Sequence, residues 1–318
     1  MLYFIESTCI IAVNVFMLIN GYFMCDKYTR NFAKPIKLII QVSLFSLLTY
    51  SINVLTNQSI FSAKGVLVSL VPVNYFVILY IVIYVISPFI NIMLNSMNIV
   101  QLKKLLIVLI SVFSIWPTMI DCLSEITGRE WLGLSSIGLY GSQWGYSVIN
   151  FAMLYIVGAY LKRVNNKSIS NIKLFGAFVA NVLIITIWAL FNNNFSLRGE
   201  RSAWEYCNPL LIVNAVLIFL LFKNIKIRLN GIINTISKET FSVYLLHAYF
   251  LQFFDIEAAV IKHPIFLLTH ILTVSILLYA FCWIIGFLFD LVFNKASGLI
   301  KVRKKKLVFN ILIESEKK

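Results

Sequence analysis

The sequence contains few charged residues, and acidic residues are the scarcest among them. Only 13% of its 318 residues are charged, and 27 Lys or Arg stand against 13 Asp or Glu. Apolar residues fill the remainder: 60% of the chain is hydrophobic and the mean hydropathy is +0.88. A soluble core does not need so much apolar surface, whereas a helical protein that crosses a membrane several times does. The composition therefore predicts a polytopic integral membrane protein.

Two further absences narrow the class of membrane protein. The apolar runs lack the alternation of apolar and polar residues that is typical of a membrane β-barrel. Backbone polar groups inside a membrane must be satisfied within the segment, so long apolar runs indicate helices. The five cysteines are also too widely spaced for a metal or redox motif. We therefore predict an all-α helical bundle without a metal site or a bound cofactor.

Nine apolar segments predict the membrane-spanning helices, because a span takes roughly 20 apolar residues. They lie near residues 3–24, 36–54, 74–95, 102–119, 146–162, 171–191, 209–223, 240–254 and 264–289. Together they define a predicted transmembrane domain over residues 1–293, followed by a basic tail over 294–318. Residues 55–73 are expected to form a short external loop with an amphipathic piece. Segment 300–313 is expected to form a helix on the membrane surface.

Basic residues collect in every second loop. The loops concerned hold Lys27, Arg30, Lys34 and Lys37; Lys103 and Lys104; Lys162, Arg163, Lys167 and Lys173; Lys223, Lys226 and Arg228; and the tail. Loops rich in Lys and Arg stay on the cytoplasmic side. We therefore predict a multi-pass protein of the cell membrane with a cytoplasmic C-terminus. This orientation explains the net charge of +14, so no nucleic-acid partner is expected.

The same alternation places Met1 outside. The first residues lack the basic region and cleavage site of a signal peptide, and Glu6 interrupts their apolar character. The charge pattern therefore predicts one further helix before Met1, which would bring the total to about ten.

Polar side chains inside the predicted spans are candidates for function, because burying them in hydrocarbon is costly. In the first span Glu6, Asn14 and Asn20 fall within roughly a third of the helix circumference at about 100° per residue. That face could line a substrate path. It could equally bond to neighbouring helices, a common role of Asn in membranes.

His247 lies near the middle of the eighth predicted span, with Tyr244 one turn before it. A histidine can deprotonate a hydroxyl, because its pKa lies near neutral. It can also serve as a neutral hydrogen-bonding group between helices. Both roles remain open at this point.

The predicted external loop 192–208 carries the densest set of charges and aromatic rings. Arg198, Arg201 and Trp204 lie in it. Aromatic rings stack on sugar rings and charged groups bind hydroxyls, so this loop is a candidate glycan contact. The alternative is an aromatic belt at the membrane surface with local ion pairs.

Five stretches, taken in order, resemble the membrane acyltransferase family 3, bacterial enzymes that acylate surface sugars. Segment 13–23 ends in Asn-Gly-Tyr-Phe, where the family usually has Ser-Gly-Tyr or Ser-Gly-Phe. Segment 74–91 is rich in aromatics and closes on Ser-Pro-Phe-Ile-Asn. Segment 154–163 reads Leu-Tyr-Ile-Val-Gly-Ala-Tyr-Leu-Lys-Arg, and Asn-Pro begins the apolar run 208–223. The last match, 236–247, ends in Thr-Phe-Ser-Val-Tyr-Leu-Leu-His.

The resemblance implies transfer of an acyl group, usually acetyl from cytoplasmic acetyl-CoA, to a hydroxyl of an extracytoplasmic polysaccharide. It implies a glycan acceptor, an acyl-CoA donor and the lipid bilayer as partners. The predicted donor-binding residues are Lys27, Arg30, Lys162 and Arg163, whose charge suits CoA phosphates. The predicted acceptor contacts are Asn14, Asn20, Tyr22, Arg198, Arg201, Trp204 and Tyr244, and His247 is the predicted catalytic base.

One departure from the family leaves other functions open. The family's first helix carries an Arg and, about ten residues later, a His that is thought to be catalytic, whereas this sequence has no His before His247. A chain without that helix could be inactive. A transporter or flippase for a surface-glycan precursor is the alternative function, although clear inverted repeats are not found.

Overall fold

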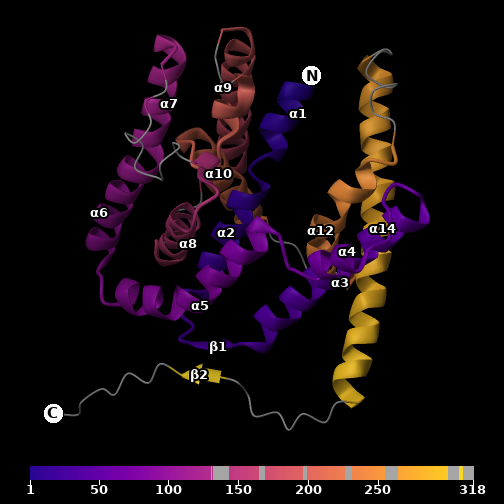
Figure 1. The fold of residues 1–318 in the computed structure, drawn as a ribbon. Helices are drawn as coiled ribbons and strands as arrows, with labels where there is room; N and C mark the ends of the chain where they lie inside the picture. Colours follow the sequence, from indigo (N-terminus) through magenta and orange to yellow (C-terminus); the bar gives the residue numbers. More distant parts are fainter. Residues whose placement is uncertain are drawn as a thin grey trace, which may run out of the picture. The chain divides into compact units, whose positions relative to one another are not determined.

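The computed structural model describes residues 1–129, 131, 143–164, 169–195, 199–225, 231–254, 264–299 and 308–310. In this part of the chain nearly all regular structure is helical, which confirms the all-α class (Figure 1). The chain divides into two compact units. Unit 1 comprises Met1–Arg30, Tyr75–Lys226 and Phe309–Lys318, and unit 2 comprises Asn31–Asn74 and Ile227–Val308. Each unit is described by itself.

Unit 1 contains most of the helices. They are α1 (Leu2–Cys9), α2 (Ala12–Met24), α5 (Tyr75–Asn95), α6 (Ile99–Ile110), the π-helical turn η1 (Ser111–Ile115), α7 (Trp116–Thr127), the 3₁₀ turn η2 (Gln143–Gly145), α8 (Val148–Arg163), α9 (Asn171–Phe195), the 3₁₀ helix η3 (Gly199–Trp204) and α10 (Pro209–Asn224).

Unit 2 contains five helices among its described residues. They are α3 (Ala33–Leu55), α4 (Ala63–Ser69), α11 (Gly231–Lys238), α12 (Thr240–Leu251) and α14 (Pro264–Leu299). Two three-residue strands, β1 (Thr29–Asn31) and β2 (Val308–Asn310), lie at unit boundaries. The helix α4 falls in the loop 55–73, where an amphipathic piece was predicted. The surface helix predicted for 300–313 lies outside the described residues, apart from β2.

Seven helical stretches among the described residues are long and apolar enough to cross a membrane. They are Leu2–Met24, Ala33–Leu55, Tyr75–Asn95, Ile99–Thr127, Asn171–Phe195, Ser202–Asn224 and Pro264–Lys295. The other two predicted spans are present as α8, with 16 residues, and α12, with 12. Both are shorter than the roughly 20 residues of a straight span. The seven long apolar stretches confirm the polytopic class.

The helices α2 and α8 cross at two glycines. A Cβ atom added at Gly21 would lie 2.0 Å from the carbonyl oxygen of Tyr155, and one added at Gly158 would lie 2.2 Å from that of Leu18. Small residues let helices in membranes approach until their backbones touch. Buried side chains of α2, α5, α6, α8 and α10 pack around this crossing, and they include Leu18, Leu94, Leu102, Ile156 and Ala215. The crossing therefore fixes α2 on α8 at the centre of unit 1.

In unit 2 a buried polar chain joins α3 to α12, and an ion pair joins α3 to α14. Gln41 of α3 donates to the Ser242 hydroxyl at 2.8 Å, and that hydroxyl donates to Glu239 Oε2 at 3.2 Å. The second oxygen of Glu239 is buried with no hydrogen-bond partner among the described residues. Asp290 of α14 forms an ion pair with Lys37 at 2.7 Å. Burial and, secondarily, the negative charge of Asp290 raise the pKa of Glu239 above its ordinary value of 4.5.

This raised pKa predicts a dependence of stability on pH. An acid whose pKa is higher in the folded state stabilises the fold fully below its unfolded pKa, and that contribution is lost as pH rises through the folded pKa. Replacing Glu239 with Gln should remove the loss, because the amide stays neutral and still accepts from Ser242. We expect the thermal midpoint of the variant in nanodiscs to exceed that of the wild type by about 2–4 °C at pH 7.5. At pH 4 the two midpoints should coincide.

The matched control is Asp290→Asn, which leaves Lys37 without its ion-pair partner. This variant should melt below the wild type at both pH values. An identical pH dependence for wild type and Glu239→Gln would show that Glu239 is not protonated preferentially in the folded state.

Candidate functional site

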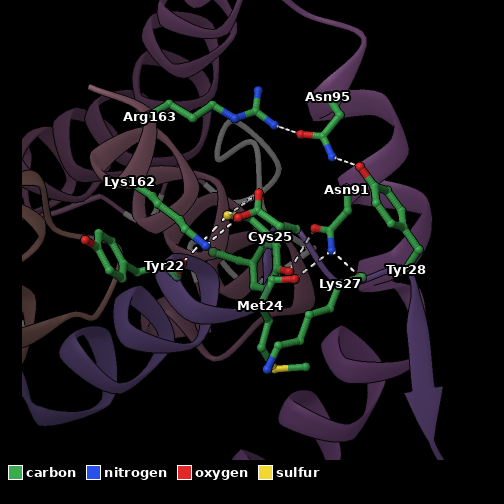
Figure 2. Close-up of polar contacts among 11 residues, drawn as sticks. Tyr22, Met24, Cys25, Lys27, Tyr28, Asn91, Asn95, Lys162 and Arg163 are labelled. Carbon is green, nitrogen blue, oxygen red and sulfur yellow. Dashed lines mark hydrogen bonds and ion pairs between the residues drawn. The ribbon is translucent and has the colours of Figure 1, made fainter. Parts of the chain in front are cut away.

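The four basic residues predicted to bind an acyl donor come together at one end of unit 1. Lys27 lies in the loop that follows α2, Arg30 lies in β1, and Lys162 and Arg163 end α8. The C-terminal part of α5 lies between them and contributes amides that bond to both segments (Figure 2). We call Lys27, Lys162 and Arg163 the cationic cluster. The charge pattern predicts that it lies on the cytoplasmic side.

Asn91 of α5 holds the loop after α2 in place. Its side-chain amide donates to the carbonyl oxygens of Met24 and Lys27, both at 2.8 Å. Its own carbonyl oxygen accepts from the hydroxyl of Tyr155 on α8 at 2.9 Å. The last carbonyls of a helix lack partners within the helix. A buried amide that meets them therefore fixes where α2 ends and how the loop begins.

Arg30 is the largest fully buried side chain of the loop, with 2% of its surface exposed. Its guanidinium donates to the carbonyl of Tyr84 at 3.1 Å and to the hydroxyl of Ser87 at 2.6 and 2.9 Å. It also donates to the carbonyls of Lys27 and Thr29. Buried charges are tolerated when hydrogen bonds satisfy them. Arg30 therefore supports the loop, and its contact with the donor stays a prediction.

The other cations stay nearer the surface. Lys162 forms an ion pair with Asp26 at 2.5 Å, and this hydrogen-bonded contact holds the pKa of Asp26 below its ordinary value. Arg163 donates to the carbonyl of Leu94 at 2.6 Å and to Asn95. The side chain of Lys27 is exposed. The cluster thus carries three cations, and Asp26 pairs with one of them, Lys162, so the cluster keeps a net positive charge that suits the phosphates of a nucleotide.

Of the predicted polar face of the first span, Asn14 and Asn20 are buried in unit 1, whereas Glu6 is exposed. Asn14 has no exposed surface and donates to the carbonyl of Tyr206 at 2.9 Å, while its own amide oxygen has no partner among the described residues. Asn20 is 8% exposed, and its amide nitrogen is likewise unpartnered there. Tyr22 lies under the ammonium of Lys223, at 5.2 Å from the ring centroid. Asn14 thus ties α2 to the segment before α10.

The loop 192–208 is described in part. Trp204 is half-buried, donates to the hydroxyl of Ser7 at 3.1 Å and packs on Tyr3 with ring centroids 5.5 Å apart. These contacts tie η3 to α1. Arg198 lies outside the described residues, as does the side chain of Arg201. The glycan contact predicted for these residues stays a prediction.

His247 lies on α12 of unit 2 with its side chain exposed. Its Nδ1 is 2.8 Å from the carbonyl oxygen of Tyr244 and 3.1 Å from that of Val243. Because carbonyl oxygens only accept, Nδ1 carries the proton of the neutral ring and Nε2 carries the lone pair. The ring of Tyr244 lies 6.1 Å away. This tautomer leaves Nε2 able to take a proton.

The residues that organise the cationic cluster were not predicted from the sequence. Asp26 pairs with Lys162, Asn95 accepts from Arg163, and Asn91, which accepts from Tyr155, holds the backbone carbonyl of Lys27. Asn91 and Tyr155 do lie inside segments 74–91 and 154–163, which carry the resemblance to acyltransferases. The signal was therefore present as a motif, but the role of each residue depends on contacts between distant helices.

Comparison with known proteins agrees with the resemblance. The family model described as "Acyltransferase domain" matches residues 1–288. Neither the curated proteins nor the solved structures gave a match.

Proposed function

The chain belongs to the acyltransferase family, and from this premise we propose that it moves acetyl from acetyl-CoA to a hydroxyl of an extracytoplasmic polysaccharide. The family and the apolar helices establish a membrane acyltransferase in general terms. The donor, the acceptor and the roles of individual residues are our proposal. The observation that carries it is the cationic cluster, which gathers three basic side chains from two distant segments at the predicted cytoplasmic end.

The cluster suits a donor that carries phosphates. Lys27 is exposed, and Lys162 pairs with Asp26 among the described residues, so a phosphate oxygen could replace Asp26 as the partner of Lys162. Arg163 is held by Leu94 and Asn95, which sets the direction of its guanidinium. Lys and Arg are the usual ligands of phosphate groups. We propose that the cluster binds the phosphates of CoA.

Transfer itself requires a base. The hydroxyl oxygen of the sugar attacks the thioester carbonyl carbon, the carbon–sulfur bond breaks, and the hydroxyl proton passes to the base while CoA leaves as the thiolate. The base then returns its proton to the thiolate, so that the products are the ester and free CoA. We propose His247 as this base, because its Nε2 carries the lone pair.

The donor assignment predicts a specific kinetic change. Replacing Lys27 and Lys162 with Gln should raise the KM for acetyl-CoA about tenfold or more, since a charge-assisted hydrogen bond contributes about 1.5–3 kcal/mol. The same pair of substitutions should change the KM for S-acetylpantetheine by less than twofold, because this donor has no phosphate. Release of free thiol and formation of acetyl ester, with the chain in nanodiscs, measure both.

Two controls sharpen the test. Lys103 and Lys104 are exposed on α6 and belong to the same predicted side, but they lie outside the cluster, so their Gln variants should keep the wild-type KM. Asp26→Asn should lower the KM for acetyl-CoA, because it removes the competing carboxylate. An equal rise in KM for both donors would contradict phosphate binding. Absence of any acetyl ester from the wild-type chain would contradict the proposed function.

A further inference from the structure

Four aromatic rings gather at the opposite end of unit 1 from the cationic cluster. Tyr75 begins α5, Trp144 and Tyr146 precede α8, and Tyr206 precedes α10. The ring of Tyr146 lies 4.5 Å from that of Tyr75, 5.1 Å from that of Tyr206 and 6.4 Å from that of Trp144, between centroids. Because α5 runs from Tyr75 to Asn95 with a rise of about 1.5 Å per residue, the two ends are about 30 Å apart.

Three of these rings are on the surface and the fourth supports them. Tyr75, Trp144 and Tyr146 are 40%, 46% and 39% exposed, whereas Tyr206 is 8% exposed. We call the three exposed rings the aromatic platform. Their surroundings in the sequence are neutral, since residues 65–102 and 132–161 contain no charged side chain. A charged ligand would therefore find no partner on these segments, whereas a neutral one with apolar faces and hydroxyls would.

The backbone beneath the platform is held in an unfavourable conformation. Trp144 has a φ of 54°, which is rare for a bulky residue, and Gly145 follows with a φ of 77°. The Tyr206 N–H donates to the Trp144 carbonyl at 2.9 Å. A Cβ at Gly145 would lie 2.5 Å from the Cys207 nitrogen, so the chain passes too close for any other residue. Such conformations cost about 1–3 kcal/mol and persist where neighbouring contacts impose them, often at binding sites.

Two buried side-chain amides, on membrane-spanning helices, hold the backbone at Trp144 and Gly145 in this conformation. Asn150 of α8 donates to the Gly145 carbonyl at 3.1 Å, and Asn14 of α2 donates to the Tyr206 carbonyl at 2.9 Å. Both side chains have no exposed surface, and the amide oxygens of both lack a hydrogen-bond partner among the described residues. Polar groups buried in a protein normally have partners. These two oxygens are thus acceptors for a hydroxyl donor, from water or from a ligand.

We propose that the aromatic platform of Tyr75, Trp144 and Tyr146 binds a neutral pyranose ring of the acceptor glycan; this inference rests on the proposed function. The apolar C–H face of a pyranose stacks on an aromatic ring, and tyrosine hydroxyls bond to those of the sugar. The platform lies on the predicted external side, opposite the cationic cluster. Acceptor and donor would thus approach from opposite ends of unit 1, and the reacting hydroxyl and thioester would meet between them.

The test measures sugar binding directly, with the full chain in nanodiscs and saturation-transfer NMR. The probes are two neutral oligosaccharides, chitotetraose and isomaltotetraose, with sorbitol as a polyol that has no ring. We expect saturation transfer to at least one oligosaccharide and none to sorbitol. Tyr146→Ala and Trp144→Gly should each weaken binding at least tenfold. Glycine suits the positive φ of residue 144, so the thermal midpoint of that variant should equal or exceed that of the wild type.

Trp131→Ala is the matched control, because Trp131 is equally exposed at 41% on a predicted external loop but is not part of the platform. Its binding should match the wild type. Equal oligosaccharide binding by the wild type and both platform variants, or none by the wild type, would overturn the proposal and leave the rings as a membrane-surface belt.

Acetyl-CoA turnover with one of the oligosaccharides as acceptor separates this proposal from the proposed function. If turnover occurs and the platform variants keep the wild-type KM for the acceptor, the platform is refuted while the acyltransferase stands. If sugar binding depends on the platform but no acetyl-CoA is consumed, the proposed function fails while the sugar site stands.

Discussion

Replacing Gly21 or Gly158 with alanine is expected to prevent stable assembly of unit 1. The added methyl group would lie 2.0 or 2.2 Å from a backbone carbonyl oxygen of the facing helix, far inside van der Waals contact. Backbone cannot move aside as a flexible side chain can, so α2 and α8 must separate. Overpacking costs about 1–3 kcal/mol and sometimes more. We expect a loss of at least about 3 kcal/mol, measured as a fall in the unfolding midpoint in detergent or as loss of the folded chain from membranes.

The chain offers a control of the same chemistry. Gly176 lies within α9, and a Cβ there meets no atom within 4 Å. Gly176→Ala should therefore be neutral or stabilising by roughly 0.5–1 kcal/mol, since alanine is the better helix former. If Gly21→Ala and Gly176→Ala gave the same midpoint, the close approach of α2 and α8 would be wrong.

Gly21 and Gly158 show what could and could not be predicted from the sequence. Hydropathy located the helices. Backbone polar groups in hydrocarbon must be satisfied within a helix, and each such helix appears in the sequence as a long apolar run. Hydropathy also placed the two short helices, since segments 146–162 and 240–254 match α8 and α12 to within three residues, but it did not indicate which helices pack together. Nor did it indicate that Gly21 faces Gly158, 137 positions later in the numbering. That pairing depends on which helices touch, and periodicity within one helix carries no such information.

The sequence likewise predicted some residues of the candidate site and missed others. The concentration of basic residues in alternate loops pointed to Lys27, Lys162 and Arg163, because loops on the cytoplasmic side are rich in Lys and Arg. The amide of Asn91, which joins the loop after α2 to α8, acts across separations of 67 and 64 residues. The aromatic platform likewise draws on separate segments. The sequence predicted Trp204 as an aromatic glycan contact, and in the structure its nitrogen donates to Ser7.

Replacing His247 with alanine is expected to lower the rate of acetyl transfer about 10²- to 10⁴-fold, the usual contribution of a general base. Stability should change little, because the side chain is exposed and its described hydrogen bonds go only to carbonyls of its own helix. The KM for acetyl-CoA should stay within twofold, since the cationic cluster is unaltered. The measurements are acetyl-ester formation, free thiol release and the thermal midpoint in nanodiscs.

Added imidazole distinguishes a base from a structural histidine. A small base that diffuses into the vacated space should restore part of the activity of His247→Ala, whereas it cannot restore a lost packing contact. His270 on α14 provides the matched control: its ring stacks on Phe266 with centroids 6.2 Å apart, and its Nε2 is buried. His270→Ala should lower the thermal midpoint but leave the rate per folded molecule unchanged and insensitive to imidazole. Full activity in His247→Ala would assign the proton transfer to another group, since nothing else in that side chain's surroundings would have changed.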